Sequence, residues 1–573
     1  MDVDAFVAAS DAYPIPTSPD GAPIHFSYGT AGFRTIGDVL ASTVFRCGAV
    51  AAIRSSVTGR ATGMVVTASH NPERDNGVKL VDCDGGMLPV AWERHAEAIA
   101  NAPTHDALRA AIELAQTPAE AHLPQHNHPP PHAPTPPPPH VFLARDTRPT
   151  GPTLAAAAKA GAEAIGAEVT DCGLMTTPQL HYVVYASYRN LPCDESDYFA
   201  RLARGFGNMV QGVAGGTHDA STIVVDCANG VGAAKLAPLR TALGADCVLT
   251  LDPRNYKYGR PGSLNNEVGA DFVQKEKTCP VHGGFDGVGA DARCVSVDGD
   301  ADRLVYFRKI NTARKGESDE SNDDSQVELF DGDKIAALMA TRVADLLKRC
   351  VPDAFDPPLR VGVVQTAYAN GASTAYVRDT LGLQVACTAT GVKFLHPEAE
   401  KFDVGVYFEA NGHGTAVFSD QTLTRLDDAI AMASSDEGDG EESDQCAALK
   451  EMKAMTEAIN PAVGDALSGI LVVEAILLAK GWGLDEWGEM YKDLPSKQVK
   501  VMVKDRAVIT TTNAERIAVT PNGEFIFVCA RAIRVTDTCI LCIQGCKRRS
   551  TRRLPSMGRT RGLSRGRVGR RMS

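Results

Sequence analysis

The chain has 573 residues, enough for about three or four domains, and its 44% hydrophobic and 22% charged residues are ordinary for a globular protein. No apolar run approaches the roughly 20 residues of a membrane-spanning helix, and a net charge of −12 argues against a general nucleic-acid binder, so we expect neither a membrane nor a nucleic acid as a partner. The N-terminus carries acids and no basic-then-apolar signal, and the 15 cysteines are scattered, which predicts a cytoplasmic protein with reduced thiols.

The first chemical motif follows an apolar run at residues 64–66 that predicts a strand. The next six residues read Thr67-Ala-Ser-His-Asn-Pro72, and Asn71-Pro72 indicates a tight turn because the residue before proline is disfavoured in a helix. Ser69 is thereby expected at the end of a strand on a tight turn, and a serine accessible on such a turn can act as a nucleophile or carry a phosphate. From this pattern alone, an ordinary turn serine is the alternative.

Three segments predict solvated surface loops. Residues 122–140 are rich in proline and histidine, which favours an extended loop over a converging set of metal ligands. Residues 317–324 and 435–444 are acidic and poor in apolar side chains.

Between these loops, short β-branched runs alternate with alanine- and leucine-rich helical stretches. Residues 222–226 precede a Gly-containing turn at 228–232 and a helical stretch, and residues 359–364 begin a second unit of the same kind. Strand, turn and helix in this order are typical of α/β folds. Their repetition predicts several α/β domains whose loops meet at a shared cleft.

A second chemical motif reads Asp298-Gly-Asp-Ala-Asp-Arg303. Alternate carboxylates separated by small residues allow Asp298, Asp300 and Asp302 to converge on one hard cation, and Arg303 is placed to bind a phosphate. An EF-hand is excluded because it needs glycine at its sixth position and glutamate at its twelfth, where this chain has Arg303 and Lys309. An acidic surface turn is the remaining alternative.

The two motifs explain each other. Mg²⁺ prefers a phosphate oxygen among its ligands, so a phosphoserine at Ser69 would complete a site formed with the three aspartates. The cation would neutralise charge on a phosphoryl group during in-line transfer. A proton must also move at the hydroxyl that receives the phosphoryl group, and either Lys79, with a pKa lowered by burial or nearby positive charge, or His70 can carry it.

Five ordered motifs resemble those of the α-D-phosphohexomutase superfamily, over roughly residues 20–522. They are Tyr28-Gly-Thr-Ala-Gly-Phe-Arg34, Thr67-Ala-Ser-His-Asn-Pro72 with Asn76-Gly-Val-Lys79, Arg145-Asp-Thr-Arg-Pro149, Asp298-Gly-Asp-Ala-Asp-Arg303 and Glu409-Ala-Asn-Gly-His-Gly414.

The resemblance implies three α/β domains around a central cleft and a C-terminal domain that is truncated or replaced. We expect the phosphoserine domain at 1–205, the metal-binding domain at 206–330, the sugar-binding domain at 331–460 and the C-terminal domain at 461–573. The last of these follows the family to about residue 523. From Glu524 onward we expect little helical or strand structure and a basic tail.

The resemblance also assigns roles to single residues. Ser69 would be the phosphoserine, and Asp298, Asp300 and Asp302 would bind one Mg²⁺ with it. The transfer site would be lined by Arg34, Lys79 and Arg303, and the sugar would be recognised by Glu409, Asn411 and His413. Asn411 resembles the residue of members that act on acetylglucosamine, where its amide would accommodate an N-acetyl group.

The implied reaction is the interconversion of N-acetylglucosamine 6-phosphate and its 1-phosphate through a hexose bisphosphate, which also serves as activator. This isomerase, an intramolecular phosphotransferase, would supply UDP-N-acetylglucosamine synthesis and would have small-molecule sugar phosphates as its partners.

The sequence departs from the family at one point. Members carry an Arg-Pro-Ser-Gly-Thr loop that holds the non-reacting phosphate, and the nearest match here is the partial one at residues 554–560. Loss of that loop would cost roughly 1.5–3 kcal/mol for each charge-assisted hydrogen bond. Two alternatives therefore stand: a catalytically defective sugar-phosphate-binding paralogue, and a mutase acting on glucose, mannose or glucosamine phosphate.

Overall fold

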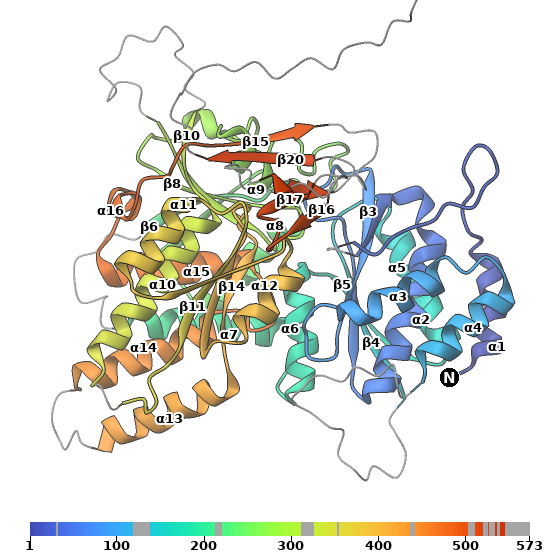
Figure 1. Cartoon of the computed structure of the whole chain (residues 1–573), viewed down its shortest axis with the longest axis horizontal. Helices are drawn as coiled ribbons and strands as arrows, with labels where there is room; N and C mark the ends of the chain where they lie inside the picture. Colours follow the sequence, from blue (N-terminus) through green and yellow to red (C-terminus); the bar gives the residue numbers. More distant parts are fainter. Residues whose placement is uncertain are drawn as a thin grey trace, which may run out of the picture.

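Three α/β units follow one another along the chain in the computed structural model (Figure 1). The structure describes residues 1–573 except 30–31, 118–137, 212–220, 311–325, 352–353, 436–441, 502–509, 520–524, 527–532, 536–538 and 545–573. The acidic segment at 317–324 and nearly all of the Pro- and His-rich segment lie outside the described residues, as does the partial match at 554–560. Figure 1 shows the first unit on the right and the other two on the left.

The first unit is a five-stranded sheet in the order β1-β3-β2-β4-β5. Strands β2, β4 and β5 are parallel, and β3 and β1 continue the sheet in antiparallel fashion. Its strands are β1 (Phe33–Ile36), β2 (Thr62–Val66), β3 (Asp75–Val81), β4 (His140–Arg145) and β5 (Glu168–Leu174). Its helices are α1 (Val3–Ala9), α2 (Ala41–Thr58), α3 (Val90–Ala100), α4 (His105–Ala115), α5 (Gly151–Ala164) and α6 (Thr177–Tyr188).

The second unit has the strand order β10-β9-β8-β6-β7, again with a parallel part, β7-β6-β8, and an antiparallel part. Its strands are β6 (Ser221–Asp226), β7 (Leu249–Arg254), β8 (Arg293–Val297), β9 (Leu304–Lys309) and β10 (Val327–Phe330). The helices here are α7 (Glu195–Val210), α8 (Gly232–Leu243) and α9 (Ala270–Glu276).

The third unit has the order β12-β11-β13-β14, with only β14 antiparallel. Its strands are β11 (Val361–Thr366), β12 (Gln384–Thr388), β13 (Val404–Phe408) and β14 (Gly414–Phe418). The helices are α10 (Gly332–Arg349), α11 (Gly371–Ala375), α12 (Val392–Ala399), α13 (Asp420–Ser435), α14 (Asp444–Ala458), α15 (Ala466–Lys480) and α16 (Leu484–Glu489).

The same connection recurs in all three units. A parallel strand turns through a short loop into an antiparallel neighbour: β2 into β3, β8 into β9, and β13 into β14. These loops hold Ser69, the three aspartates and Glu409, respectively. Because each loop follows the carboxyl end of a parallel strand, the fold presents all three motifs at equivalent edges of their sheets.

The hydrophobic interior is organised as two large clusters. One belongs to the first unit and includes Phe45 and Leu143; the other is shared by the second and third units, and Tyr182 and Ala186 of α6 also pack into it. Helices α2 and α5 approach closely in the first cluster because both carry glycine at the contact. A Cβ on Gly48 or Gly161 would lie 2.2 or 1.8 Å from a backbone oxygen of the opposite helix.

Helix α15 is apolar on all sides because it lies inside the shared cluster. Its 15 residues span about 22 Å, short of the roughly 30 Å of a bilayer core. Among the described residues, no helix is long and apolar enough to cross a membrane.

Short strands follow the third unit: β15 (Ser496–Val501), β16 (Thr510–Thr512), β17 (Ile517–Val519), β18 (Phe525–Ile526), β19 (Ile533–Val535) and β20 (Cys539–Gln544). The expectation of little regular structure after Glu524 is wrong for residues 539–544, which pair antiparallel with β15. The physical reason is the unbroken apolar run of five residues that begins at Cys539, a pattern typical of a strand.

Candidate active site

Residues from all three units line one cavity. The first unit contributes Arg34, Ser69 and Lys79, the second Asp302 and Arg303, and the third Glu409 and His413. Ser69 and Asp298 lie 229 residues apart in the sequence, yet the Ser69 hydroxyl donates a hydrogen bond of 2.6 Å to Asp298 Oδ2. The proximity of the serine and the aspartates that the sequence predicts is therefore present in the fold.

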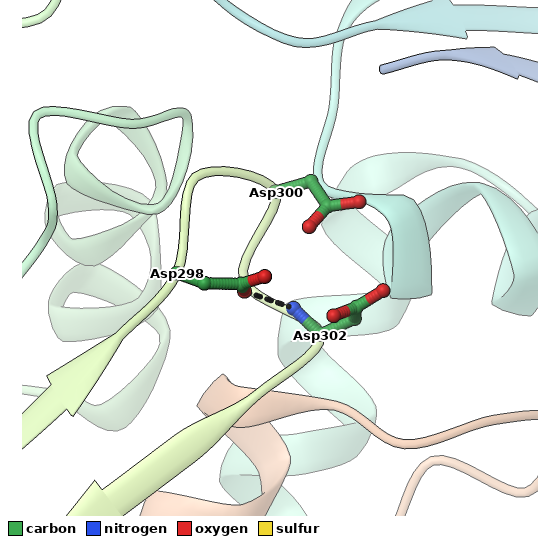
Figure 2. Close-up of side chains that lie close together, drawn as sticks. All are labelled: Asp298, Asp300 and Asp302. Carbon is green, nitrogen blue, oxygen red and sulfur yellow. Dashed lines mark hydrogen bonds between the residues drawn. The ribbon is translucent and has the colours of Figure 1, made fainter. Parts of the chain in front are cut away.

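The aspartate loop curls so that its three carboxylates converge (Figure 2). One oxygen from each of Asp298, Asp300 and Asp302 lies within 4.8 Å of the others, and all three residues are buried. The turn is closed at Ala301, which has a positive φ of 57°, and by the backbone N–H of Asp302, which donates to Asp298 Oδ1 at 3.1 Å.

Three buried carboxylates repel one another and require positive charge. Burial, followed by the charges of Asp302 and Asp300, raises the pKa of Asp298 well above its ordinary value. Lys79 Nζ donates to Asp300 Oδ2 at 2.8 Å and to Asp302 Oδ2 at 2.7 Å. Although burial opposes it, the contact with Lys79 and the charges of His413 and Arg303 hold the pKa of Asp302 below its ordinary value.

The carboxylates fit a hard divalent cation. Oδ1 of Asp300 and Oδ1 of Asp302 are buried and have no hydrogen-bond partner in the described structure. A buried carboxylate oxygen is costly unless a donor or a metal satisfies it. Oxygen ligands converging in this way are those that Mg²⁺ prefers.

The two candidates for proton transfer occupy different environments. Burial alone would lower the pKa of Lys79, but the charges of Asp300 and Asp302 raise it above its ordinary value. The lowered pKa expected for Lys79 is therefore wrong for this arrangement. For His70, burial and then the charge of Arg303 lower the pKa well below its ordinary value. His70 lies outside the described cavity lining, which includes Lys79.

Two guanidinium groups make the cavity suitable for phosphate. Arg34 donates to the side-chain oxygen of Asn71 at 2.8 Å, and burial followed by the charge of Arg303 lowers its pKa to about 10. Arg303 lies 3.4 Å from Asp271 and 3.7 Å from Asp302. Paired guanidiniums in one cavity favour an anionic ligand with several oxygens.

Glu409, in the loop that the sequence predicts to bind the sugar, connects this loop to neighbouring segments of the third unit. Its Oε1 accepts hydrogen bonds from the Tyr368 hydroxyl at 2.8 Å and from the Gly391 N–H at 3.1 Å. Asn411 lies outside the described cavity lining; its Nδ2 donates to Glu409 Oε2 at 3.4 Å, and its Oδ1 accepts from the His413 N–H at 3.0 Å. Asn411 thus contacts the loop itself, whereas Glu409 and His413 line the cavity.

Several residues near the cavity were not predicted from the sequence. Lys393 and Glu93 line the cavity and form an ion pair of 2.7 Å, and Thr177 donates to Asp300 Oδ2 at 2.7 Å. The only sequence signal for Lys393 is Gly391-Val-Lys393 at the start of a helix, which is too common to indicate a site. Glu93 and Thr177 lie at helix starts and carry no distinguishing signal.

This fold and this site define a phosphohexomutase: repeated α/β units that bring a serine loop, an aspartate loop and a glutamate loop to one cavity. Two family models agree. The model described as phosphoacetylglucosamine mutase AMG1, domain III, matches residues 331–482, and that of the phosphoglucomutase/phosphomannomutase alpha/beta/alpha domain I matches residues 43–106 and 133–193. The chain belongs to the phosphoacetylglucosamine mutase family, a family of isomerases.

Relatives match over most of their length. The phosphoacetylglucosamine mutase of Oryza sativa subsp. japonica is 45% identical, covering 88% of this chain and 86% of its own. The human phosphoacetylglucosamine mutase is 39% identical, covering 91% and 88%. The crystal structure of Aspergillus fumigatus N-acetylphosphoglucosamine mutase in complex with GlcNAc-6P and magnesium gives a TM-score of 0.78 at 38% identity over 95% of each chain. A serine-to-alanine variant of the Aspergillus fumigatus enzyme, in complex with glucose 1,6-bisphosphate, is 36% identical over 94% of each chain, also with a TM-score of 0.78.

Proposed function

We propose that this chain interconverts N-acetylglucosamine 6-phosphate and N-acetylglucosamine 1-phosphate, with Ser69 as the phosphoserine and Mg²⁺ held by Ser69, Asp298, Asp300 and Asp302. The contact between the Ser69 hydroxyl and Asp298 inside a cavity lined by arginines and by Glu409 carries the proposal. Relatives crystallised with GlcNAc-6P and magnesium, and with glucose 1,6-bisphosphate, support the substrate class and the cofactor.

The reaction has two transfers. A free sugar hydroxyl attacks the phosphorus of phosphoserine 69; the new P–O bond forms as the Ser69 Oγ–P bond breaks, giving the sugar bisphosphate and a free serine. After the bisphosphate turns over in the cavity, Ser69 Oγ attacks its other phosphate and the product leaves. Mg²⁺, when bound, supplies positive charge for the transferring phosphoryl group.

Residues of this chain perform the remaining tasks. Arg34 and Arg303 bind phosphate oxygens, and Glu409 and His413 orient the sugar. Lys79, an ammonium beside Asp300 and Asp302, gives a proton to Ser69 Oγ as the Oγ–P bond breaks and takes the proton of the attacking sugar hydroxyl in its place; we assign this role to Lys79 because it lines the cavity and His70 does not. Asn411 favours the N-acetylated sugar by fixing the carboxylate of Glu409 rather than by lining the cavity.

The cellular role follows from the substrate. We place the reaction in the cytoplasm, where it supplies UDP-N-acetylglucosamine synthesis, with small-molecule sugar phosphates as its partners. The division into domains at 1–205, 206–330, 331–460 and 461–573 belongs to the same proposal.

The test is phosphopeptide mapping combined with turnover. With Mg²⁺ and glucose 1,6-bisphosphate, we expect a single phosphate on Ser69 and conversion of N-acetylglucosamine 6-phosphate to the 1-phosphate. Ser69→Ala should lose both signals, whereas the exposed Ser196→Ala should keep both. A chain that binds N-acetylglucosamine 6-phosphate without turnover would instead be the defective paralogue, and equal turnover of glucose 6-phosphate would remove the specificity.

A further inference from the structure

The serine loop has a backbone conformation that it cannot maintain alone. Ser69 has φ = 50°, in the left-handed region that costs a non-glycine residue roughly 1–3 kcal/mol. Glycine would remove that cost but also the hydroxyl. Such a conformation persists only where surrounding contacts hold it.

Two side chains hold the loop through the same pair of carbonyl oxygens. Arg148 Nη2 donates to the backbone oxygens of Ser69 at 3.1 Å and Asn71 at 2.7 Å. Asn265 Nδ2 donates to the same two oxygens at 2.8 and 3.0 Å. Arg148 lies in the first unit, on the loop after β4, whereas Asn265 lies in the second unit between β7 and α9.

Asn265 is also tied to the aspartate loop. Its backbone N–H donates to Ala228 O at 3.1 Å, which fixes it within the second unit. A Cβ on Gly299, the residue between Asp298 and Asp300, would lie 2.8 Å from Asn265 Nδ2 and 2.7 Å from Ser69 O. The Asn265 amide, the metal-binding loop and the serine loop therefore meet at one point.

We propose that Asn265 is a positioning residue for phosphoryl transfer. Its amide holds the serine loop of the first unit at a fixed position relative to the aspartate loop of the second unit. It thereby sets the distance between Ser69 Oγ and the carboxylates. This inference rests on the proposed function. Asn265 acts through the backbone of residues 69 and 71, and Arg148 holds that backbone within its own unit.

The test compares three variants of the full chain. Asn265→Asp replaces the donor with a charged acceptor that faces two carbonyl oxygens, and Asn265→Ala removes both hydrogen bonds without adding charge. Asn190→Ala is the matched control, because Asn190 and Asn265 both have a φ of 55°, and the Asn190 side chain is exposed and lies away from the cavity. The measurements are the unfolding temperature, kcat and KM for N-acetylglucosamine 6-phosphate, and the rate at which glucose 1,6-bisphosphate phosphorylates Ser69.

We expect Asn265→Asp to lower kcat and the Ser69 phosphorylation rate by about 10- to 100-fold, because a displacement near 1 Å at the reacting atoms has a cost of this order. KM should stay within about twofold, since Glu409 and His413 are untouched. Asn265→Ala should show a smaller loss of the same kind and keeps the test valid if Asn265→Asp does not fold.

Equal kcat and phosphorylation rates in Asn265→Ala and Asn190→Ala would overturn the role of Asn265, as would a rise in KM that accounts for the whole loss. The wild-type chain separates the two proposals. An inactive wild type overturns the proposed function itself, whereas an active wild type with unaffected Asn265 variants overturns only this inference.

Discussion

At the scale of single residues, Asp298 shows how the site places catalysis and stability in opposition. Its carboxylate is buried beside Asp300 and Asp302, and its Oδ2 accepts the hydrogen bond from Ser69. An amide at this position would keep an oxygen acceptor and cannot ionise, so it removes the cost of burial and repulsion that raises the pKa of Asp298. Sites of this kind commonly gain stability when function is lost.

We therefore predict that Asp298→Asn raises the unfolding temperature of the metal-free protein by roughly 1–3 °C. It should also lower mutase activity by at least about 100-fold, because the cation loses a charged ligand. Mg²⁺ should stabilise the wild type and fail to stabilise the variant, since only a bound ligand shifts the unfolding equilibrium. Thermal unfolding with and without Mg²⁺ measures both effects, and a metal-free variant less stable than the wild type contradicts the prediction.

His181 gives a prediction about pH. It is 2% exposed, its Nδ1 lies 2.7 Å from Gly85 O, and burial lowers its pKa to about 4. Between pH 6.5 and 4 the unfolded chain takes up a proton that the folded chain does not. The contribution of His181 to the unfolding free energy is therefore fully present above pH 6.5. It declines as the pH falls toward 4, by roughly 3 kcal/mol at most.

We predict that His181→Gln loses less unfolding free energy than the wild type when the pH falls from 7 to 4.5. Denaturant unfolding at several pH values measures the difference, with the exposed His105→Gln as control. Parallel curves for wild type and His181→Gln would show that another group causes the acid sensitivity.

At the scale of elements, one ion pair joins helices that lie 300 residues apart in the sequence. Glu93 is in the first turn of α3, and Lys393 is in the first turn of α12. Their side chains are only 16% and 12% exposed, so the solvent screens the pair weakly. Removing one partner leaves a largely buried charge unpaired, and removing both does not.

We predict that Glu93→Gln lowers the unfolding free energy by about 1–3 kcal/mol, and that adding Lys393→Met recovers most of the loss. Asp427→Asn, which breaks the more exposed pair with Lys453, should cost less than about 1 kcal/mol. A double-mutant cycle with chemical denaturation measures the coupling, and additive losses at residues 93 and 393 would refute it.

The elements also show what sequence patterns contain and what they omit. Residues 222–226 predict all but the first residue of β6, and the run at 359–364 predicts β11 two residues early, because β-branched runs beside glycine are typical of strands. The shared loop architecture of the three units is not visible in the sequence, since the serine, aspartate and glutamate loops have different residues. The connection from a parallel strand to an antiparallel neighbour repeats in the three units, although the amino acids of the loops do not. Asn265 and Lys393 could not be predicted because their roles depend on packing between units.

At the scale of the whole molecule, the two large hydrophobic clusters do not coincide with the three sheets. Helix α7 contributes Tyr198, Phe199 and Leu202 to the cluster shared by the second and third units. The domain boundary predicted at residue 205 falls inside this helix. The composition of α7 indicates an amphipathic helix, and only the fold shows which sheet its apolar face contacts.

We predict two calorimetric transitions, one for the first unit and one for the second and third units together, because domains that share a core unfold cooperatively. Each substitution removes about 2–5 kcal/mol of unfolding free energy from its cluster. Leu143→Ala should therefore lower the temperature of the first unit's transition, and Leu471→Ala should lower that of the other transition. Three resolved transitions, or a shift of both transitions by either variant, would contradict this assignment.

The left-handed backbone at position 69 restricts which amino acid can serve there. Threonine offers an equally phosphorylatable hydroxyl, but its branched Cβ makes a positive φ far more costly than it is for serine. Threonine therefore cannot replace serine at position 69 without a large conformational cost, and the reason is the backbone geometry and not the reactivity of the hydroxyl.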